Sequence, residues 1–238
     1  MQGVRYLFAA IALALLAGCV LADDIVTMPT ANQLKRGEID LAVYYLGLDF
    51  PAGAPQHVNY QTLYVGLTDK WEVDAHRSDI DRNEDATIFV VSYKLMSEKA
   101  KQPDMVVGVR NLFGTATTLD NPLTPIDERD KSKDQSFFLA AAKTFFFNPM
   151  APGPPLVRVH AGLGTEDWTL LGEERHEGLF GGLQFLFLPW LGGVVQHDGT
   201  DLITGITVMP KDTGLTLKGG TYGDHWWVGL AWRKQLTW

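Results

Sequence analysis

Apolar and polar residues alternate along most of this chain in short segments, and turn residues separate one segment from the next. Successive side chains of a β-strand point to opposite faces, so alternation with a period of two predicts strands rather than helices. The breaks contain Gly, Pro, Asn, Asp or clustered charges, which are typical of strand ends. Twelve strands are predicted, at 39–48, 59–68, 71–78, 86–96, 105–113, 136–147, 156–164, 178–188, 191–197, 201–209, 215–222 and from Trp226 to the C-terminus.

The last of these strands is also the most aromatic part of the chain. Its alternation places Trp226, Trp232 and Trp238 on one apolar face, with Lys234 as the exception. One interpretation is the edge strand of a soluble β-sandwich. The other is the last strand of an outer-membrane barrel, in which the apolar face contacts lipid and the Trp side chains lie at the membrane interfaces.

The lengths of the breaks distinguish these two interpretations. The longest breaks, Phe113–Gln135 and Gly164–Glu177, both follow odd-numbered strands. Bacterial outer-membrane barrels have an even number of strands, short periplasmic turns and longer outer loops. We therefore expect an all-β fold, a closed antiparallel up-and-down transmembrane β-barrel of twelve strands. The strand that ends at Trp238 would pair with the first strand, and its terminal aromatic resembles the signal that the barrel-assembly machinery reads.

The N-terminus predicts export. Arg5 precedes an apolar run from Tyr6 to Leu16 that is followed by small residues, as in a secretory signal peptide. Residues 1–18 are expected to be removed and Cys19, the only cysteine, to be lipidated; cleavage after Ala22 is the alternative. The predicted organisation is a signal peptide (1–18), a periplasmic segment (19–38) and a barrel (39–238) in the bacterial outer membrane.

The composition of the chain limits the classes of partner that it can bind. The formal net charge of −8 and the pI of about 5.2 argue against nucleic acid as a partner. No later segment has the roughly 18 uninterrupted apolar residues of a membrane helix. The expected partners are outer-membrane lipids and the barrel-assembly machinery, and an anionic polysaccharide is a further candidate.

Charged residues collect on the face opposite to the apolar one. The acids are expected on early strands and most bases on later ones, with six bases against three acids, and two histidines, His76 and His160, join them. One interpretation is a network of ion pairs that holds the barrel wall in shape, in which Asp40 pairs with Arg233; the other is a basic lumen that attracts an anionic ligand. The charged residues expected to face the lumen are Asp40, Glu72, Asp74, Lys94, Arg110, Lys143, Arg158, Lys218 and Arg233.

Catalytic motifs are scarce. His76 and Ser78 share one strand face, as a serine hydrolase would need, but only Asp74 is near enough in sequence to orient the histidine. The chain has no P-loop, no GxGxxG motif and no His/Cys set with metal-ligand spacing. We therefore expect no enzyme, cofactor or metal, with a lipid-modifying hydrolase centred on His76 and Ser78 as the catalytic alternative.

The C-terminal quarter of the chain carries a family resemblance. The segment VVQHDGTDLITGITVMPKDTGLTLKGGTYGDHWWVGLAW resembles the C-terminal part of YjbH/GfcD-type outer-membrane lipoproteins, which are associated with exopolysaccharide production. The family often has an acidic residue where Gln196 stands here, and its members are much longer. The matching residues are His197, Asp198, Gly199, Asp201, Gly205, Gly219, Gly220, Gly223 and Asp224.

The resemblance implies a short single-barrel relative that helps a polysaccharide reach or cross the outer membrane. From the residues, the expected function is an accessory or conduit for envelope polysaccharide, or a small anion-preferring channel. The alternative is a structural or adhesive surface barrel with a plugged lumen, in which the loop Phe113–Gln135 carries the function.

Overall fold

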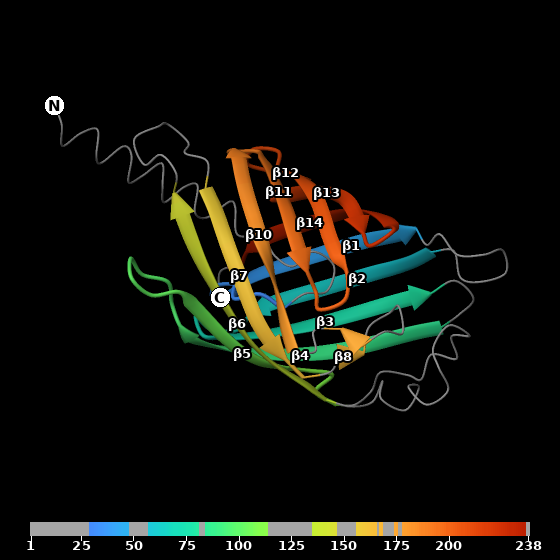
Figure 1. The fold of residues 1–238 in the computed structure, drawn as a ribbon, viewed down its shortest axis with the longest axis horizontal. Helices are drawn as coiled ribbons and strands as arrows, with labels where there is room; N and C mark the ends of the chain where they lie inside the picture. Colours follow the sequence, from blue (N-terminus) through green and yellow to red (C-terminus); the bar gives the residue numbers. More distant parts are fainter. Residues whose placement is uncertain are drawn as a thin grey trace.

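In the computed structural model of this chain, twelve antiparallel strands form a closed barrel (Figure 1). The structure describes residues 29–47, 57–80, 84–113, 135–146, 156–165, 167–168, 174–175 and 178–236. Neighbours around the barrel follow the order β1-β14-β13-β12-β11-β10-β7-β6-β5-β4-β3-β2. The barrel strands are β1 (Glu38–Gly47), β2 (His57–Gly66), β3 (Trp71–Ile80), β4 (Glu84–Met96), β5 (Asp104–Arg110), β6 (Ser136–Phe146), β7 (Leu156–Gly164), β10 (Gly178–Leu188), β11 (Leu191–His197), β12 (Leu202–Val208), β13 (Leu215–Tyr222) and β14 (His225–Gln235).

The predicted fold class is confirmed, and each predicted strand is present. A two-stranded hairpin, β8 (Asp167–Trp168) with β9 (Glu174–Arg175), lies outside the barrel order in a segment that the sequence pattern assigned to a loop. Two residues per strand are too short for any alternation to be visible. Cys19 and Trp238, for which lipidation and a terminal role in closure are predicted, lie outside the described residues.

The barrel closes between its first and last strands. β1 and β14 pair over their full lengths in a register that sets Asp40 opposite Arg233 and Tyr44 opposite Gly229. Closure leaves no barrel strand with an unpaired edge, so every strand finds a hydrogen-bonding neighbour on both sides.

The outer face of the barrel is apolar. Each of the twelve barrel strands contributes at least one exposed large apolar side chain, such as Leu41 on β1, Leu139 on β6 and Val195 on β11. Aromatic pairs lie near the strand ends, where Trp71 contacts Tyr93 with ring centroids 4.7 Å apart. Among the described residues, no helix is long and apolar enough to cross a membrane.

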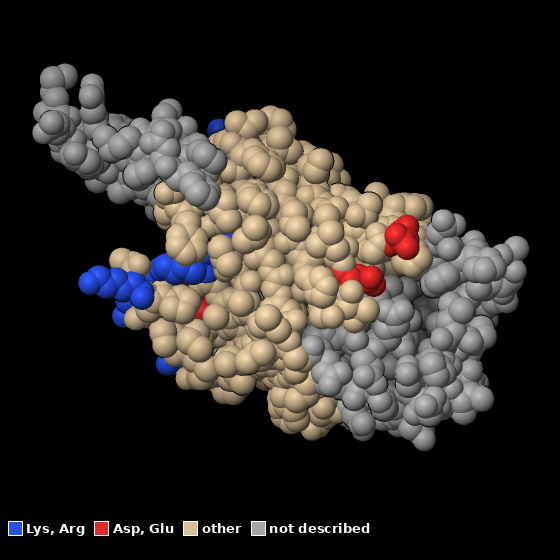
Figure 2. Space-filling view, viewed as in Figure 1, with Lys and Arg blue, Asp and Glu red and all other residues tan. Residues whose placement is uncertain are grey.

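On the face of the molecule that Figure 2 shows, the visible charged side chains lie toward the two ends of the barrel. In the view of Figure 2, Lys and Arg gather at the end that carries the turn between β4 and β5, and Asp and Glu are seen toward the opposite end. The basic end is also the one at which β1 begins and β14 ends (Figure 1). The barrel is therefore polar at its ends and apolar around its circumference on this face.

The inner face contains two apolar clusters that fill different parts of the lumen. The first cluster, named here the ring cluster, belongs to β1, β2 and β11–β14. The second cluster belongs to β4, β5, β6 and β10 together with Ala31 from the segment before β1. The ring cluster consists of Ala42, Tyr44, Leu46, Val58, Tyr60, Val194, Ile203, Tyr222, Trp227 and Ala231. The second consists of Ala31, Ile88, Val90, Val106, Phe138, Ala140, Ala142 and Phe180.

Inward-facing glycines make room for these rings. A Cβ atom at Gly229 would lie 2.3 Å from the ring of Tyr44, its partner on β1, and a Cβ at Gly162 would lie 2.2 Å from the ring of Phe180. Such distances are shorter than atomic contacts allow, so glycine is required where a large ring lies flat against the wall. Alternating small and large inward residues therefore let the barrel fill its own interior.

Candidate functional site: the plugged interior

The segment that precedes β1 enters the barrel. We call Pro29–Gly37 the strap; its residues Ala31 and Leu34 are 0% and 2% exposed. The part of the predicted periplasmic segment 19–38 that the structure describes thus lies inside the barrel from Pro29 to Leu34, and Lys35 and Arg36 are exposed before β1 begins. No apolar alternation marks this segment, so the sequence offered little sign of its location.

The strap reaches walls on two sides of the lumen. The amide of Asn32 donates to Gln184 of β10 at 3.5 Å, and the amide of Gln33 donates to Ser92 of β4 at 2.5 Å. The backbone N–H of Leu34 donates to the Glu72 carboxylate of β3 at 2.6 Å. Because β10 is separated from β3 by β4, β5, β6 and β7 around the barrel, these bonds span the interior.

Two glycines shape the turn between the strap and β1. Gly37 has a φ of +78°, which glycine adopts without strain, and its N–H donates to the Gly66 carbonyl at 2.8 Å. A Cβ at Gly66 would lie 2.0 Å from the Lys35 carbonyl oxygen. The absence of side chains at both positions lets the chain fold back into the barrel at this point.

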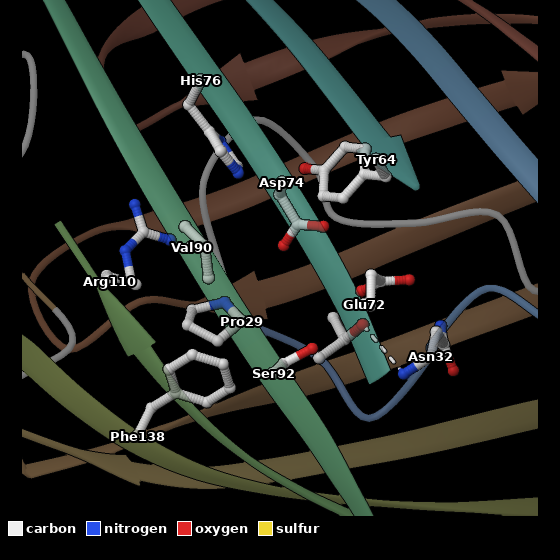
Figure 3. Close-up of a pocket in the computed structure, with 11 residues that line it drawn as sticks. Pro29, Asn32, Tyr64, Glu72, Asp74, His76, Val90, Ser92, Arg110 and Phe138 are labelled. Carbon is white, nitrogen blue, oxygen red and sulfur yellow. Dashed lines mark hydrogen bonds between the residues drawn. The ribbon is translucent and has the colours of Figure 1, made fainter. Parts of the chain in front are cut away.

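A small polar cavity lies beside the strap (Figure 3). Its lining includes Asp74 and His76 of β3, Ser92 of β4 and Arg110 of β5, together with Asn32 of the strap. The free volume is about 20 Å³, enough for one or two water molecules.

His76 connects the cavity to the ring cluster. Its Nδ1 atom is hydrogen-bonded to the Tyr60 hydroxyl, and its ring meets the Tyr64 ring edge-on at a centroid distance of 5.3 Å. Its Nε2 atom is buried and has no hydrogen-bond partner among the described residues. Buried polar atoms are normally satisfied, so a water molecule in the cavity is the expected partner for Nε2.

The catalytic alternative can be placed in the same region. His76 and Ser78 both face the interior and are 3% and 4% exposed. A lipid that contacts the outer face of the barrel therefore does not reach them. Among the residues that the structure describes, no group of three or more His, Cys, Asp or Glu could hold a metal ion.

Arg158 of β7, which is 1% exposed, is enclosed by acids. Its guanidinium donates to Glu98 and Asp104 at 2.7 Å each and to the Thr144 hydroxyl at 2.9 Å. Two carboxylates and one hydroxyl around a buried guanidinium form a charge-assisted network that ties β7 and β6 to the turn between β4 and β5. Arg158 is thus committed to structure rather than exposed to a solute.

Other inner charges also have partners within the barrel. Arg233 and Asp40 form the expected pair across the closing strands, with Nε and Oδ2 2.9 Å apart. The Lys218 ammonium donates to the Tyr44 hydroxyl at 3.2 Å. Asp74, Glu72 and Arg110 are buried on the inner face, whereas Lys94, near the end of β4, is half-buried.

The placement of Lys143 on the inner face was wrong. Burial along β6 alternates so that Phe138, Ala140 and Ala142 face inward, which leaves Lys143 on the outward face. Its ammonium instead bonds to the Lys99 and Gln102 carbonyl oxygens and lies 3.3 Å from Glu98. The physical reason is that strict alternation continues to the end of this strand, beyond its last buried alanine.

The sequence reading also missed three inner acids. Glu98 and Asp104 lie at the turn between β4 and β5, and Asp198 lies in the turn after β11, where it is fully buried and accepts a hydrogen bond from Tyr222 at 2.6 Å. Alternation assigns no face to residues in or next to turns, so these acids went uncounted. With them included, the predicted excess of basic charge inside the barrel disappears.

Comparisons with known proteins give limited information. No protein-family model matches this chain, and no curated protein matches it. Among solved structures, the N-terminal β-barrel domain of Pseudomonas aeruginosa OprF matches with 8% sequence identity and a TM-score of 0.26, covering 84% of this chain and 100% of that chain. The description of the fold therefore rests on the strand pairing of this chain itself.

Proposed function

We propose that this protein is an integral β-barrel of the bacterial outer membrane that is closed to solutes in the state described here. The observation that carries the membrane assignment is the apolar outer face, to which every barrel strand contributes. Soluble monomers rarely expose a continuous apolar patch larger than a few hundred Å². A barrel that is apolar all around its outside and charged inside is suited to lipid rather than to water.

The filled interior supports a structural or accessory role over that of a general diffusion pore. Two apolar clusters and the strap occupy the lumen, and the cavity beside the strap is of water size, about 20 Å³. The balance of inner acids and bases gives no support to anion selectivity. A role in envelope polysaccharide production, which the family resemblance implies, stays a prediction, and the small cavity favours an accessory over a conduit.

Heat-modifiability on SDS gels and reconstitution into liposomes test this proposal. Folded membrane barrels resist SDS until they are heated, so the unheated protein should migrate faster, float with liposomes and show negligible conductance in a planar bilayer. Steady wild-type conductance would exclude the closed state. A protein that stays with the soluble fraction would exclude the membrane assignment.

A matched pair of variants sharpens the membrane assignment. Leu230 points outward from the middle of β14, and Leu230→Lys should destabilise the folded barrel in lipid by about 2–4 kcal/mol because a charge then faces hydrocarbon. Thr200→Lys, in the exposed turn after β11, should change the free energy of unfolding little. Equal effects of the two variants, measured by urea unfolding in liposomes, would contradict a lipid-facing β14.

A further inference from the structure

We propose that the strap occupies a solute passage, and that its withdrawal lets small uncharged polar solutes such as sugars cross the barrel. This inference rests on the membrane-barrel function proposed above. It goes beyond that function because it assigns a conditional transport activity, and a class of solute, to a barrel that is closed in the state described here.

The strap is attached much less firmly than the wall around it. Barrel strands are joined to both neighbours by continuous backbone ladders, whereas residues 29–34 of the strap belong to no strand ladder among the described residues. Gly37, at the end of the strap, keeps a backbone hydrogen bond to Gly66 of β2. Inside the lumen the strap is held by hydrogen bonds from three consecutive residues, Asn32, Gln33 and Leu34, and by the packing of Ala31 in the second apolar cluster. The strap can therefore leave its place without breaking a strand pairing.

The turn at Gly37 provides the point about which the strap can move. Its positive φ and the close approach of Lys35 to Gly66 mark an abrupt change of chain direction. Lys35 and Arg36 are exposed at this turn, outside the buried part of the strap. Rotation at a few such residues is sufficient to move a short segment as a unit.

The surroundings of the strap differ from those of a sealed core. The cavity is lined by Glu72, Asp74, Arg110, the Tyr64 ring and Ser92. These groups have partners in the closed barrel, and water can replace the strap as a partner of Ser92 and Glu72 when the strap leaves. A polar wall beneath a detachable segment is what an aqueous passage needs.

The chemistry of the strap contacts indicates the class of solute. The strap presents three N–H donors to the acceptors Gln184, Ser92 and Glu72. Hydroxyl groups of a sugar provide equivalent donors. Two carboxylates and one guanidinium lie together in the lining, so one negative charge is in excess and an anionic solute is disfavoured. The hydrogen-bonding groups of the lining suit an uncharged polar solute.

Liposome swelling tests this inference in the full chain. A variant that lacks residues 29–34 but keeps the turn Lys35–Gly37 should let liposomes swell in isosmotic glucose, whereas wild-type liposomes should not. The tetrasaccharide stachyose provides a size control and should cause little swelling. A deleted variant that is heat-modifiable, floats with liposomes and remains impermeable to glucose would overturn the passage.

Point variants keep the test decisive if the deleted protein fails to fold. Asn32→Ala with Gln33→Ala removes two strap donors and leaves the wall untouched, so glucose permeability should rise about tenfold as the open population grows. Thr204→Ala removes an outward hydrogen bond to Thr221 and should leave permeability unchanged. Equal permeability of these two variants would also overturn the passage.

A reversible cross-link separates withdrawal of the strap from a general leak. The Gln33 amide and the Ser92 hydroxyl are in contact, so Gln33→Cys with Ser92→Cys, in a chain carrying Cys19→Ser, places two thiols that a short reducible cross-linker can join. Permeability should be low when the pair is cross-linked and should rise when the linker is reduced. Permeability that ignores the redox state would reject the strap as the moving part. Wild-type protein that does not float with liposomes would refute the membrane assignment instead.

Discussion

In one half of the barrel interior, rings fixed on β1, β2 and β11–β14 fill the lumen, whereas in the other half a tethered segment lies between β3, β4 and β10. The ring cluster places Tyr44 between Tyr60 and Trp227, with both centroid distances at 6.2 Å. The strap half contains Ala31 and Leu34 of the strap, both buried, together with buried charges of the wall. The first half is closed by the wall itself, and the second by a part of the chain that precedes the wall.

This difference between the two halves shows how one barrel can combine a stable wall with a segment in its lumen that can detach. Ring packing against glycine makes the wall and the filling a single unit, because each ring belongs to a strand of the barrel ladder. The strap is bound to its surroundings through three hydrogen bonds, worth about 1 kcal/mol each for the neutral pairs and about 2 kcal/mol for the bond to Glu72, and through the packing of Ala31. Substitutions in the ring half should therefore lower global stability, whereas those in the strap should mainly alter local opening.

The largest effect is expected from Trp227→Ala. Trp227 is 1% exposed and packs against Tyr44 in the ring cluster, so its removal leaves a large cavity and should cost about 4 kcal/mol in the free energy of unfolding. Urea unfolding in liposomes measures this loss. Trp226→Ala is the matched control, because Trp226 lies next in sequence but on the outward face. Equal losses for the two would mean that the rings do not hold this half together.

Much of the barrel could be predicted because its signals are local. Alternation locates the strands, and antiparallel closure then brings Asp40 to Arg233 although the two residues are 193 positions apart. Face assignment failed at Lys143 because the sequence of β6 is apolar at both alternate sets of positions, so alternation could not tell its inner face from its outer face. The inner acids Glu98 and Asp104 were missed because they lie at a turn, where a period of two assigns no face.

The strap could not be predicted for a different reason. Its position depends on contacts with β3, β4 and β10, which are far away in sequence, and a segment of nine residues with Ala31 and Leu34 as its buried apolar residues has no recognisable periodicity. In the sequence, Gly37 and Gly66 are the residues whose type reflects the position of the strap, but glycine is frequent throughout this chain and does not single them out. Long-range packing of an irregular segment leaves little trace in composition or pattern.

The next largest effect is expected from Arg158→Ala, which tests whether the wall of the strap half is stable by itself. The substitution leaves the Glu98 and Asp104 carboxylates without their shared partner, so the free energy of unfolding should fall by about 3 kcal/mol. Adding Glu98→Gln and Asp104→Asn should recover part of this loss. Lys211→Ala is the control, because Lys211 and Asp212 form an exposed pair whose loss should be close to neutral. A neutral Arg158→Ala would show that the network does not hold the wall.

A smaller effect is expected where the two halves meet. Tyr60 belongs to the ring cluster and is hydrogen-bonded to His76, which lines the cavity beside the strap. Tyr60→Phe keeps the ring and removes this bond, so unfolding should become easier by about 1 kcal/mol. Tyr93→Phe, on the exposed outer face, is the control and should change stability little. A Tyr60→Phe effect no larger than that of the control would mean that the bond between Tyr60 and His76 does not couple the stabilities of the two halves.

The smallest effect on global unfolding is expected from Leu34→Ala. This variant is the most direct test of the difference between the ring half and the strap half. A Leu buried to this degree in a cooperative core would cost about 2–5 kcal/mol on truncation. If the strap leaves before the barrel unfolds, the free energy of unfolding should change by less than about 1 kcal/mol, while amide hydrogens of the strap exchange faster. Ile203→Ala, fully buried in the ring cluster, is the matched deletion and should show the full cost. A full cost at both positions would make the strap part of the same cooperative core as the rings, because the strap then could not detach while the barrel remains folded.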